Sequence, residues 1–201
     1  QFFYPLAKAD DRPFMPLSFE PYTLPDSEQT NLKKFRFAYD GKEDYAMIDE
    51  SPSPTWVVYF HSYGGSALEI YNSPLIHPQW LEAVKTQHFG LVSFETSGNS
   101  WMAPFVADAI HHALAEIRAK YAVKNFIFIG GSMGGSSVLI YCVRYPEDVS
   151  AALAMCPVSD MAKHYEDSLR NPDPNFYMKN WPVATFYGES DNQRRRSFQL
   201  N

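Results

Sequence analysis

The sequence IFIGGSMGG, residues 127–135, decides how the rest of the chain is interpreted. Its first part belongs to an apolar, β-branched and aromatic run that begins at Asn125, which predicts a buried strand. The glycines surround Ser132 in the pattern G-x-S-x-G, and residues 136–144 have the composition of a helix. A serine at such a junction sits on a sharp, strained turn, so its close neighbours must lack a Cβ. The stretch therefore predicts a nucleophile elbow with Ser132 as the nucleophile.

A glycine-rich turn between a strand and a helix has a second interpretation, which is a phosphate-binding site. Such turns carry the patterns G-x-x-x-x-G-K-S/T or G-x-G-x-x-G, and no lysine follows the glycines here. The N–H of Met133 and the start of the helix would face a developing oxyanion. The stretch therefore favours catalysis by the serine hydroxyl over phosphate binding.

The composition is that of a single globular domain of 201 residues, with 45% hydrophobic and 20% charged side chains. A net charge of −6 argues against a nucleic-acid partner, and no apolar run approaches the length of a membrane span, so no membrane partner is expected. Cys142 and Cys156 are expected to be buried and too far apart to form a disulfide. The compartment stays open between the cytoplasm and secretion after removal of a leader.

The sequence predicts two structurally different segments, residues 1–30 and residues 31–201. The first segment mixes five prolines with aromatic residues, which predicts an extended arm on the domain surface and not a folded unit. The second segment alternates strand-like and helix-like runs, which predicts a parallel α/β sheet with right-handed crossovers. An antiparallel hairpin is expected before that sheet, with Asp40 and Gly41 as its turn.

The remaining elements follow from the spacing of apolar residues. Helices are expected at 68–87, broken near two prolines, and at 103–121, 136–144 and 159–169. Strands are expected at 33–39, 45–49, 56–60, 89–95, 125–129, 149–155 and 183–187. Ligands of parallel sheets bind at the carboxyl ends of the strands, and the polar motifs of this sequence follow strands there.

The motif HSYGG at residues 61–65 follows one of these strands. A strand that ends in His before glycines can turn a backbone N–H into an active site. The alternative is an ordinary turn with a structural histidine. In the functional interpretation, the oxyanion donors are the N–H of Met133 and that of Ser62 or Tyr63, between which the sequence does not decide.

Asp191, which follows the expected strand 183–187, is the candidate acid that would orient a histidine. A solvated turn residue is the alternative for Asp191, and Asp160 is a competing acid that also suits a helix N-cap. Trp101 and Met102 follow another strand near the elbow. They are candidates either for substrate binding or for the core.

The candidate base is missing from the expected position. The chain order Ser, acid, His requires a histidine after Asp191, and the sequence has none there. His164 follows Ser132 but precedes Asp191, while His111 and His112 are neighbours on one helix, where adjacent positions point apart and do not suit a metal site. We therefore expect no metal, a base outside residues 1–201, and poor ester hydrolysis by the 201-residue chain.

The motifs at 61–65, 130–135 and 187–191, in this order, resemble the α/β-hydrolase superfamily, with a similarity to small esterases and prolyl-oligopeptidase-like hydrolase domains. The resemblance covers about residues 33–192. It implies a three-layer α/β sandwich with a mostly parallel central sheet and an antiparallel N-terminal hairpin. It also implies that Ser132 is the nucleophile and Asp191 the acid. The family's last strand and helix, with the catalytic histidine between them, have no counterpart in the sequence. Either the chain is truncated or the protein is a catalytically impaired relative, and the intact elbow and acid loop favour truncation.

The activity that this resemblance implies is hydrolysis of a carboxylic ester through an acyl-enzyme on Ser132. The substrate would be a small-molecule ester, and no cofactor is required. A serine peptidase, an acyltransferase and a non-catalytic binding protein on the same fold remain alternatives, because a fold does not fix a function.

Overall fold

The computed structural model describes residues 12–24 and 32–170. The chain divides into two compact units, of which the larger is Ala9–Pro157. All strands of the described sheet belong to this larger unit. In the smaller unit the structure describes residues 158–170, including helix α5 (Met161–Arg170). The strand expected at 183–187 lies outside the described residues. The expected core of residues 31–201 is thus divided after residue 157.

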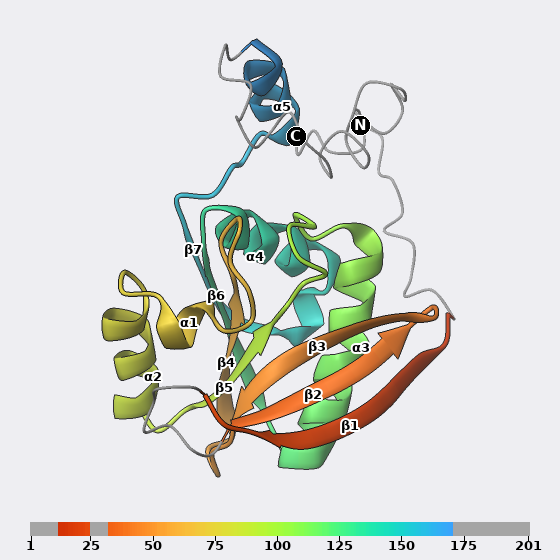
Figure 1. Cartoon of the computed structure of the whole chain (residues 1–201), viewed down its shortest axis with the longest axis vertical. Helices are drawn as coiled ribbons and strands as arrows, with labels where there is room; N and C mark the ends of the chain where they lie inside the picture. The colour runs from red at the N-terminus through yellow and green to blue at the C-terminus, as the bar shows by residue number, and fades with distance from the viewer. Residues whose placement is uncertain (1–11, 25–31, 171–201) are drawn as a thin grey trace. The chain divides into compact units, whose positions relative to one another are not determined.

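Three antiparallel strands form one side of the sheet: β1 (Phe14–Tyr22), β2 (Leu32–Tyr39) and β3 (Lys42–Asp49), visible in Figure 1 as a long twisted ribbon. Asp40 and Gly41 connect β2 to β3 with φ of 51° and 74°. Positive φ at both central residues is what a two-residue hairpin turn of type I′ requires. The hairpin expected from the sequence is confirmed.

Strand β1 corrects the expected role of residues 1–30. Residues 14–22 were expected to belong to an extended arm on the domain surface, and no strand was predicted there, but they pair with β2 along its length. Pro16 and Pro21 fit because β1 is an outer strand of the described sheet, so one of its edges needs no partner. The register also shifts between Pro16 and Ser18, which is the kind of irregularity that accommodates a proline.

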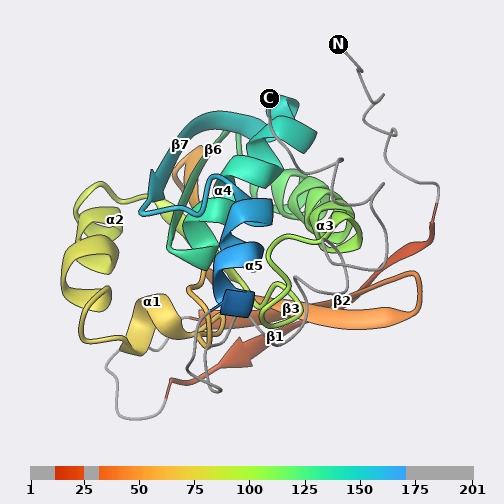
Figure 2. The same ribbon diagram turned by 90° about the horizontal axis from the view of Figure 1, so that it is seen from above.

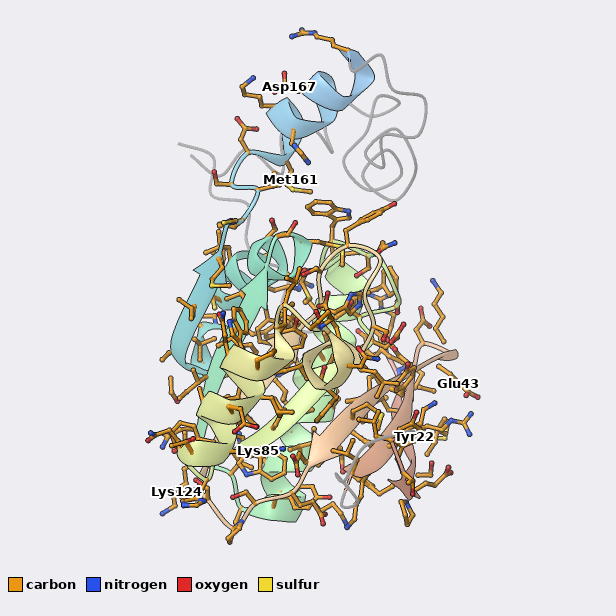
Figure 3. All side chains as sticks on the ribbon, turned by 60° about the vertical axis from the view of Figure 1, so that its left-hand side comes forward. Tyr22, Glu43, Lys85, Lys124, Met161 and Asp167 are labelled. Carbon is orange, nitrogen blue, oxygen red and sulfur yellow. The ribbon has the colours of Figure 1, made fainter. Side chains whose placement is uncertain are left out.

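Four parallel strands complete the sheet: β4 (Thr55–Phe60), β5 (Gly90–Phe94), β6 (Asn125–Gly131) and β7 (Val149–Met155). The order is β1-β2-β3-β5-β4-β6-β7. The chain moves from β4 to β5 on one side and then crosses to β6 on the other, so the change of direction lies at β4. Figure 3 labels Lys124, directly before β6, at the lower edge of the sheet, which places the carboxyl ends of the parallel strands at the upper edge. A ligand site is expected there.

Helices cover both faces of this sheet (Figure 2). One face carries α1 (Glu69–Asn72), the π-helical turn η1 (His77–Leu81) and α2 (Glu82–Thr86). The other carries α3 (Pro104–Tyr121) and α4 (Met133–Arg144), and a 3-10 turn, η2 (Pro146–Asp148), leads into β7. The predicted three layers and mixed sheet are confirmed, as is the interruption of the segment 68–87.

Strand β4 shows why the sheet holds together. Val57 and Tyr59 belong to the buried cluster beneath α1 and α2. Trp56 packs on Tyr121 of α3 at 4.9 Å between ring centroids, and Phe60 packs on Tyr141 of α4 at 5.9 Å. A strand covered on both faces needs apolar residues at every position, which explains the continuous run in the sequence.

Strand β7, which lies at the other side of the described sheet from β1, is more exposed to solvent than the central strands. Leu153 and Met155 of β7 are 52% and 40% exposed. An apolar hollow of about 240 Å³ runs between α2 and strands β4, β6 and β7, and Leu153 contributes to its wall. Cys156, directly after β7, is exposed, so the expectation that it is buried was wrong. Cys142 is partly buried, and both thiols are free.

Candidate active site

Ser132 lies between β6 and α4 with φ of 53° and ψ of −118°. These angles are unfavourable for a residue with a Cβ and persist only where the surroundings impose them. Its N–H donates a hydrogen bond to the carbonyl of Met155 in the neighbouring strand, at 2.9 Å. The predicted positive φ is confirmed, and Ser132 is exposed at the carboxyl end of β6.

The glycines around Ser132 allow elements of the backbone to touch. A Cβ on Gly130 would lie 2.5 Å from the carbonyl group of Gly134, and a Cβ on Gly134 would lie 2.1 Å from the carbonyl oxygen of Phe60. Gly131 differs, because the nearest atom to its Cβ would be the Ser62 hydroxyl at 3.9 Å. The predicted lack of space at Gly130 and Gly134 is confirmed, and it brings the start of α4 against the end of β4.

The start of α4 directs positive charge at the region of the Ser132 hydroxyl. Met133 is the first residue of this helix, and the first N–H groups of a helix have no partner within it. The first turn carries no acidic side chain. The hydroxyl of Ser137 donates to the carbonyl of Met133 at 2.9 Å, within the same first turns of the helix. The positive end of the helix dipole therefore suits an anion at this position.

His61 is a structural residue at the end of β4. It is fully buried, with Nε2 at 2.8 Å from the carbonyl oxygen of Glu95 and 2.9 Å from the hydroxyl of Thr96. Its Nδ1 lies 2.7 Å from the carbonyl oxygen of Ser62. Both ring nitrogens are thus engaged, and His61 ties the loop after β4 to the loop after β5.

The loop at 61–65 reaches the elbow and is held by side chains from elsewhere. The Ser62 hydroxyl donates to the carbonyl of Gly131 at 3.4 Å, which shows how near this loop lies to Ser132. The Ser62 N–H donates to Oε2 of Glu69 at 2.7 Å, and the Gly64 N–H donates to Oδ1 of Asn99 at 2.7 Å. The two N–H groups are therefore oriented by side-chain acceptors.

A second carboxylate supports the same loop. Oε2 of Glu95 accepts hydrogen bonds from the hydroxyl of Tyr45 at 2.8 Å and the N–H of Ala67 at 2.9 Å. Burial and the neighbouring Glu95 carboxylate raise the pKa of Tyr45 above its usual value, so this hydroxyl stays a donor. Glu69, Glu95 and Asn99 were not among the predicted site residues. Only Glu69 had a local signal, and a weak one: an acceptor side chain a few residues beyond a glycine-rich turn.

Trp101 and Met102 are almost completely buried, at 1% and 0% exposure. Both have positive φ, of 53° and 56°. The Trp101 ring lies 6.5 Å from that of Tyr63, measured between centroids, so the loop after β5 packs against the loop after β4. Trp101 thus packs against the 61–65 loop and Met102 is buried beside it in the chain, and the contact of either residue with a substrate stays a prediction.

The candidate acid Asp191 lies outside the described residues. Asp160 instead has a capping role, because its Oδ1 accepts the N–H of Lys163 at 2.8 Å in the first turn of α5. This agrees with the alternative role considered for it.

A histidine–carboxylate pair does occur in the larger unit, but it lies at the other edge of the sheet. Nδ1 of His111 is 2.7 Å from Oδ2 of Asp148. Asp148 directly precedes β7 and so belongs to the amino ends of the parallel strands, whereas Ser132 follows the carboxyl end of β6. This pair is therefore not the partner of Ser132. His164 belongs to the smaller unit.

Within residues 12–24 and 32–170, no group of three or more His, Cys, Asp or Glu side chains is arranged to hold a metal ion. No helix within these ranges is both long and apolar enough to cross a membrane.

A family model described as the alpha/beta hydrolase fold matches residues 55–181, more than half of the chain. The chain therefore belongs to the α/β-hydrolase fold family. A search of curated proteins finds no match.

Several solved structures share this fold. Est1E from Butyrivibrio proteoclasticus is 15% identical with a TM-score of 0.54, over 74% of this chain and 60% of that one. FphF, a Staphylococcus aureus fluorophosphonate-binding serine hydrolase, is 10% identical with a TM-score of 0.54, over 84% and 64%. A cold-adapted esterase from an Arctic intertidal metagenomic library is 14% identical with a TM-score of 0.50, over 68% and 62%. The chain thus spans less than two thirds of each, and identities this low show a common fold.

Proposed function

We propose that this protein is a serine hydrolase that cleaves a carboxylic ester through an acyl-enzyme on Ser132. The observation that carries the proposal is the backbone of Ser132, held at φ 53° between a strand and a helix that glycines allow to touch. Strain of this kind is retained at functional sites, and here it exposes one hydroxyl at the edge where α/β sheets bind ligands. The esterase and serine-hydrolase names of the structural neighbours agree with this reading.

In the proposed reaction, Oγ of Ser132 attacks the ester carbonyl carbon while a histidine takes its proton. The carbonyl oxygen becomes an oxyanion that accepts hydrogen bonds from the N–H of Met133 and from an N–H of the 62–63 turn. Collapse of this intermediate expels the alcohol, which receives the proton, and leaves the acyl group on Ser132. Water then repeats the sequence and releases the acid, so no cofactor takes part.

Asp191 is proposed to orient the histidine and to stabilise its cation. The chain order of the family places that histidine after Asp191. We propose that Trp101, which packs against Tyr63 of the 61–65 loop, and the buried Met102 next to it shape the side of the pocket that receives the substrate. The substrate is a small-molecule ester, and neither a nucleic acid nor a membrane partner enters the proposal.

A peptidase or an acyltransferase would use the same nucleophile, and a binding protein would not use it at all. The test is labelling with a fluorophosphonate probe, followed by mapping of the tagged peptide in the full-length protein. Tagging at Ser132 that disappears in Ser132→Ala supports an enzyme, whereas an untagged Ser132 contradicts the proposal. Turnover of short-chain nitrophenyl esters in preference to peptide nitroanilides would then identify an esterase.

A further inference from the structure

Glu69 occupies an unusual place for a carboxylate beside a site that stabilises an anion. It is the first residue of α1, and its Oε2 accepts two hydrogen bonds. One comes from the N–H of Ser62 at 2.7 Å and the other from the hydroxyl of Tyr59 at 2.5 Å. Burial and the Glu69 carboxylate raise the pKa of Tyr59, so this hydroxyl remains a donor to Glu69.

The neighbouring glycine makes room for this arrangement. A Cβ on Gly65 would lie 2.9 Å from both Cδ and Oε1 of Glu69. The Gly65 N–H itself turns back to the carbonyl of Ser62 at 2.9 Å, which closes the turn. The carboxylate therefore fills the inside of the loop that joins β4 to α1, and only a residue without a Cβ fits beside it.

The bond from the Ser62 N–H to Glu69 fixes the backbone of the turn. A hydrogen bond to a carboxylate is stronger than one between neutral groups. The Ser62 N–H would have to give up such a bond in order to stabilise an oxyanion. Tyr63 lies between two residues whose N–H groups are held by side chains. The Ser62 N–H is held by Glu69, and the Gly64 N–H is held by Asn99.

We propose that Glu69 is a positioning residue of the oxyanion hole: by holding the Ser62 N–H it fixes the backbone of the 62–63 turn beside Ser132. This inference rests on the proposed function, because it concerns the same reaction. The inference adds to the proposed function, because Glu69 touches neither the substrate nor Ser132. The negative charge of Glu69 opposes a nearby oxyanion, so the benefit of the residue lies in geometry.

The test compares three variants with the wild type in the full-length protein. Glu69→Ala removes the acceptor of Ser62, Glu69→Gln keeps an acceptor oxygen without the charge, and Tyr59→Phe removes only the other donor to Glu69. We expect Glu69→Ala to lower kcat by about 10²-fold, the loss typical of one missing oxyanion donor, with KM changed by less than about threefold. Glu69→Gln should recover most of the rate, and Tyr59→Phe should stay close to wild type.

Two readouts separate positioning from general destabilisation. Affinity for a trifluoromethyl ketone, which forms a tetrahedral adduct with an oxyanion, should fall in Glu69→Ala in parallel with kcat. Amide hydrogen exchange at Ser62 should accelerate in the same variant and remain slow in Glu69→Gln. Gly65→Ala, which displaces the carboxylate, should reproduce the Glu69→Ala result in both measurements.

The outcomes distinguish the two proposals. If the wild type is labelled at Ser132 and hydrolyses esters but Glu69→Ala does so equally well, the assignment of Glu69 is wrong and the proposed function stands. If the wild type is neither labelled nor active, the proposed function is wrong and the role of Glu69 in it is overturned as well. A rise in KM alone, with unchanged kcat and unchanged inhibitor affinity, would also contradict a role of Glu69 in positioning the oxyanion hole.

Discussion

Gly134 packs directly against the end of the central strand: a Cβ on Gly134 would lie 2.1 Å from the carbonyl oxygen of Phe60. Because that oxygen belongs to the backbone of a buried strand, it has little freedom to move away. The contact fixes the start of α4 against β4, and with it the position of Ser132. Neither Gly130 nor Gly134 has a positive φ, so the glycines of the G-x-S-x-G pattern serve close packing here.

Substitution of Gly134 by alanine should therefore destabilise the fold, by about 1–3 kcal/mol or more, as overpacking of a rigid site does. The matched control is Gly131→Ala in the same stretch, where the nearest atom would be 3.9 Å from the new Cβ. Chemical denaturation of both variants measures the difference. Equal free energies of unfolding for the two would show that the turn accommodates a side chain and is an ordinary loop.

The backbone angles of Ser132 favour glycine, so glycine at position 132 should stabilise the fold relative to a residue with a Cβ. At φ 53° and ψ −118°, glycine relieves strain that serine and alanine both carry, so Ser132→Gly should be more stable than Ser132→Ala by about 1 kcal/mol. Both variants lose the hydroxyl and should lose ester hydrolysis. The melting temperatures of the pair check the first statement and a nitrophenyl ester assay checks the second. Activity within a few-fold of wild type in either variant would remove Ser132 from the mechanism.

Asp108 is a buried carboxylate on α3 that binds α4, with 1% of its side chain exposed. Its Oδ1 accepts hydrogen bonds from Nε of Arg144 and the hydroxyl of Tyr145, both at 2.6 Å. Asp108→Ala should cost about 3–5 kcal/mol, because it leaves a partly buried guanidinium without its partner. The control is Glu43→Ala, which breaks an exposed ion pair with Arg36 and should cost less than about 1 kcal/mol. Similar losses in the two variants, measured by denaturation, would contradict this ranking.

His111 should make the fold more stable at acidic than at alkaline pH. The hydrogen bond to Asp148 raises the pKa of His111, so the folded state binds this proton more tightly than the unfolded state. Its contribution is complete below the unfolded pKa, about 6.5, and is lost as the pH rises through the folded pKa. The free energy of unfolding of the wild type should therefore exceed that of His111→Asn by more at pH 6 than at pH 8.

The adjacent His112 provides the control of opposite sign. Burial, followed by the charge of His111, lowers the pKa of His112, so protonation of this residue favours the unfolded state as the pH falls. As the pH falls from 8 to 6, the free energy of unfolding of His112→Asn should thus rise relative to that of the wild type. The same pH dependence in both variants would show that Asp148 does not distinguish the two imidazoles.

The strands and helices were largely predictable because each carries its own pattern. The hairpin around Asp40 and Gly41, the buried strand before Ser132 and the long helix 104–121 all appear close to their expected bounds. Strand β1 was not predicted, because Pro16 and Pro21 count against a strand until it is known that the strand lies at an edge of the sheet. Pairing partners distant in sequence supply that information, and a local pattern does not.

The site was predictable only in part, for a similar reason. Ser132 and its glycines obey a local rule, so the sequence indicated its backbone conformation. Glu69 and Asn99 have no such rule: they act through hydrogen bonds to N–H groups 7 and 35 positions away. Their role follows from the meeting of the loops after β4 and β5, which depends on the order of strands in the sheet. The acid, Asp191, remains a prediction.

The hydrogen bond from the Ser132 N–H to Met155 joins the elbow to β7, the outermost described strand on that side and one with exposed side chains. Residues at such a margin open more often than those of a central strand. Separation of the end of β7 would remove a bond that helps to hold the strained angles of Ser132. The shape of the elbow therefore depends on the pairing of β7 with β6 as well as on the glycines that flank Ser132.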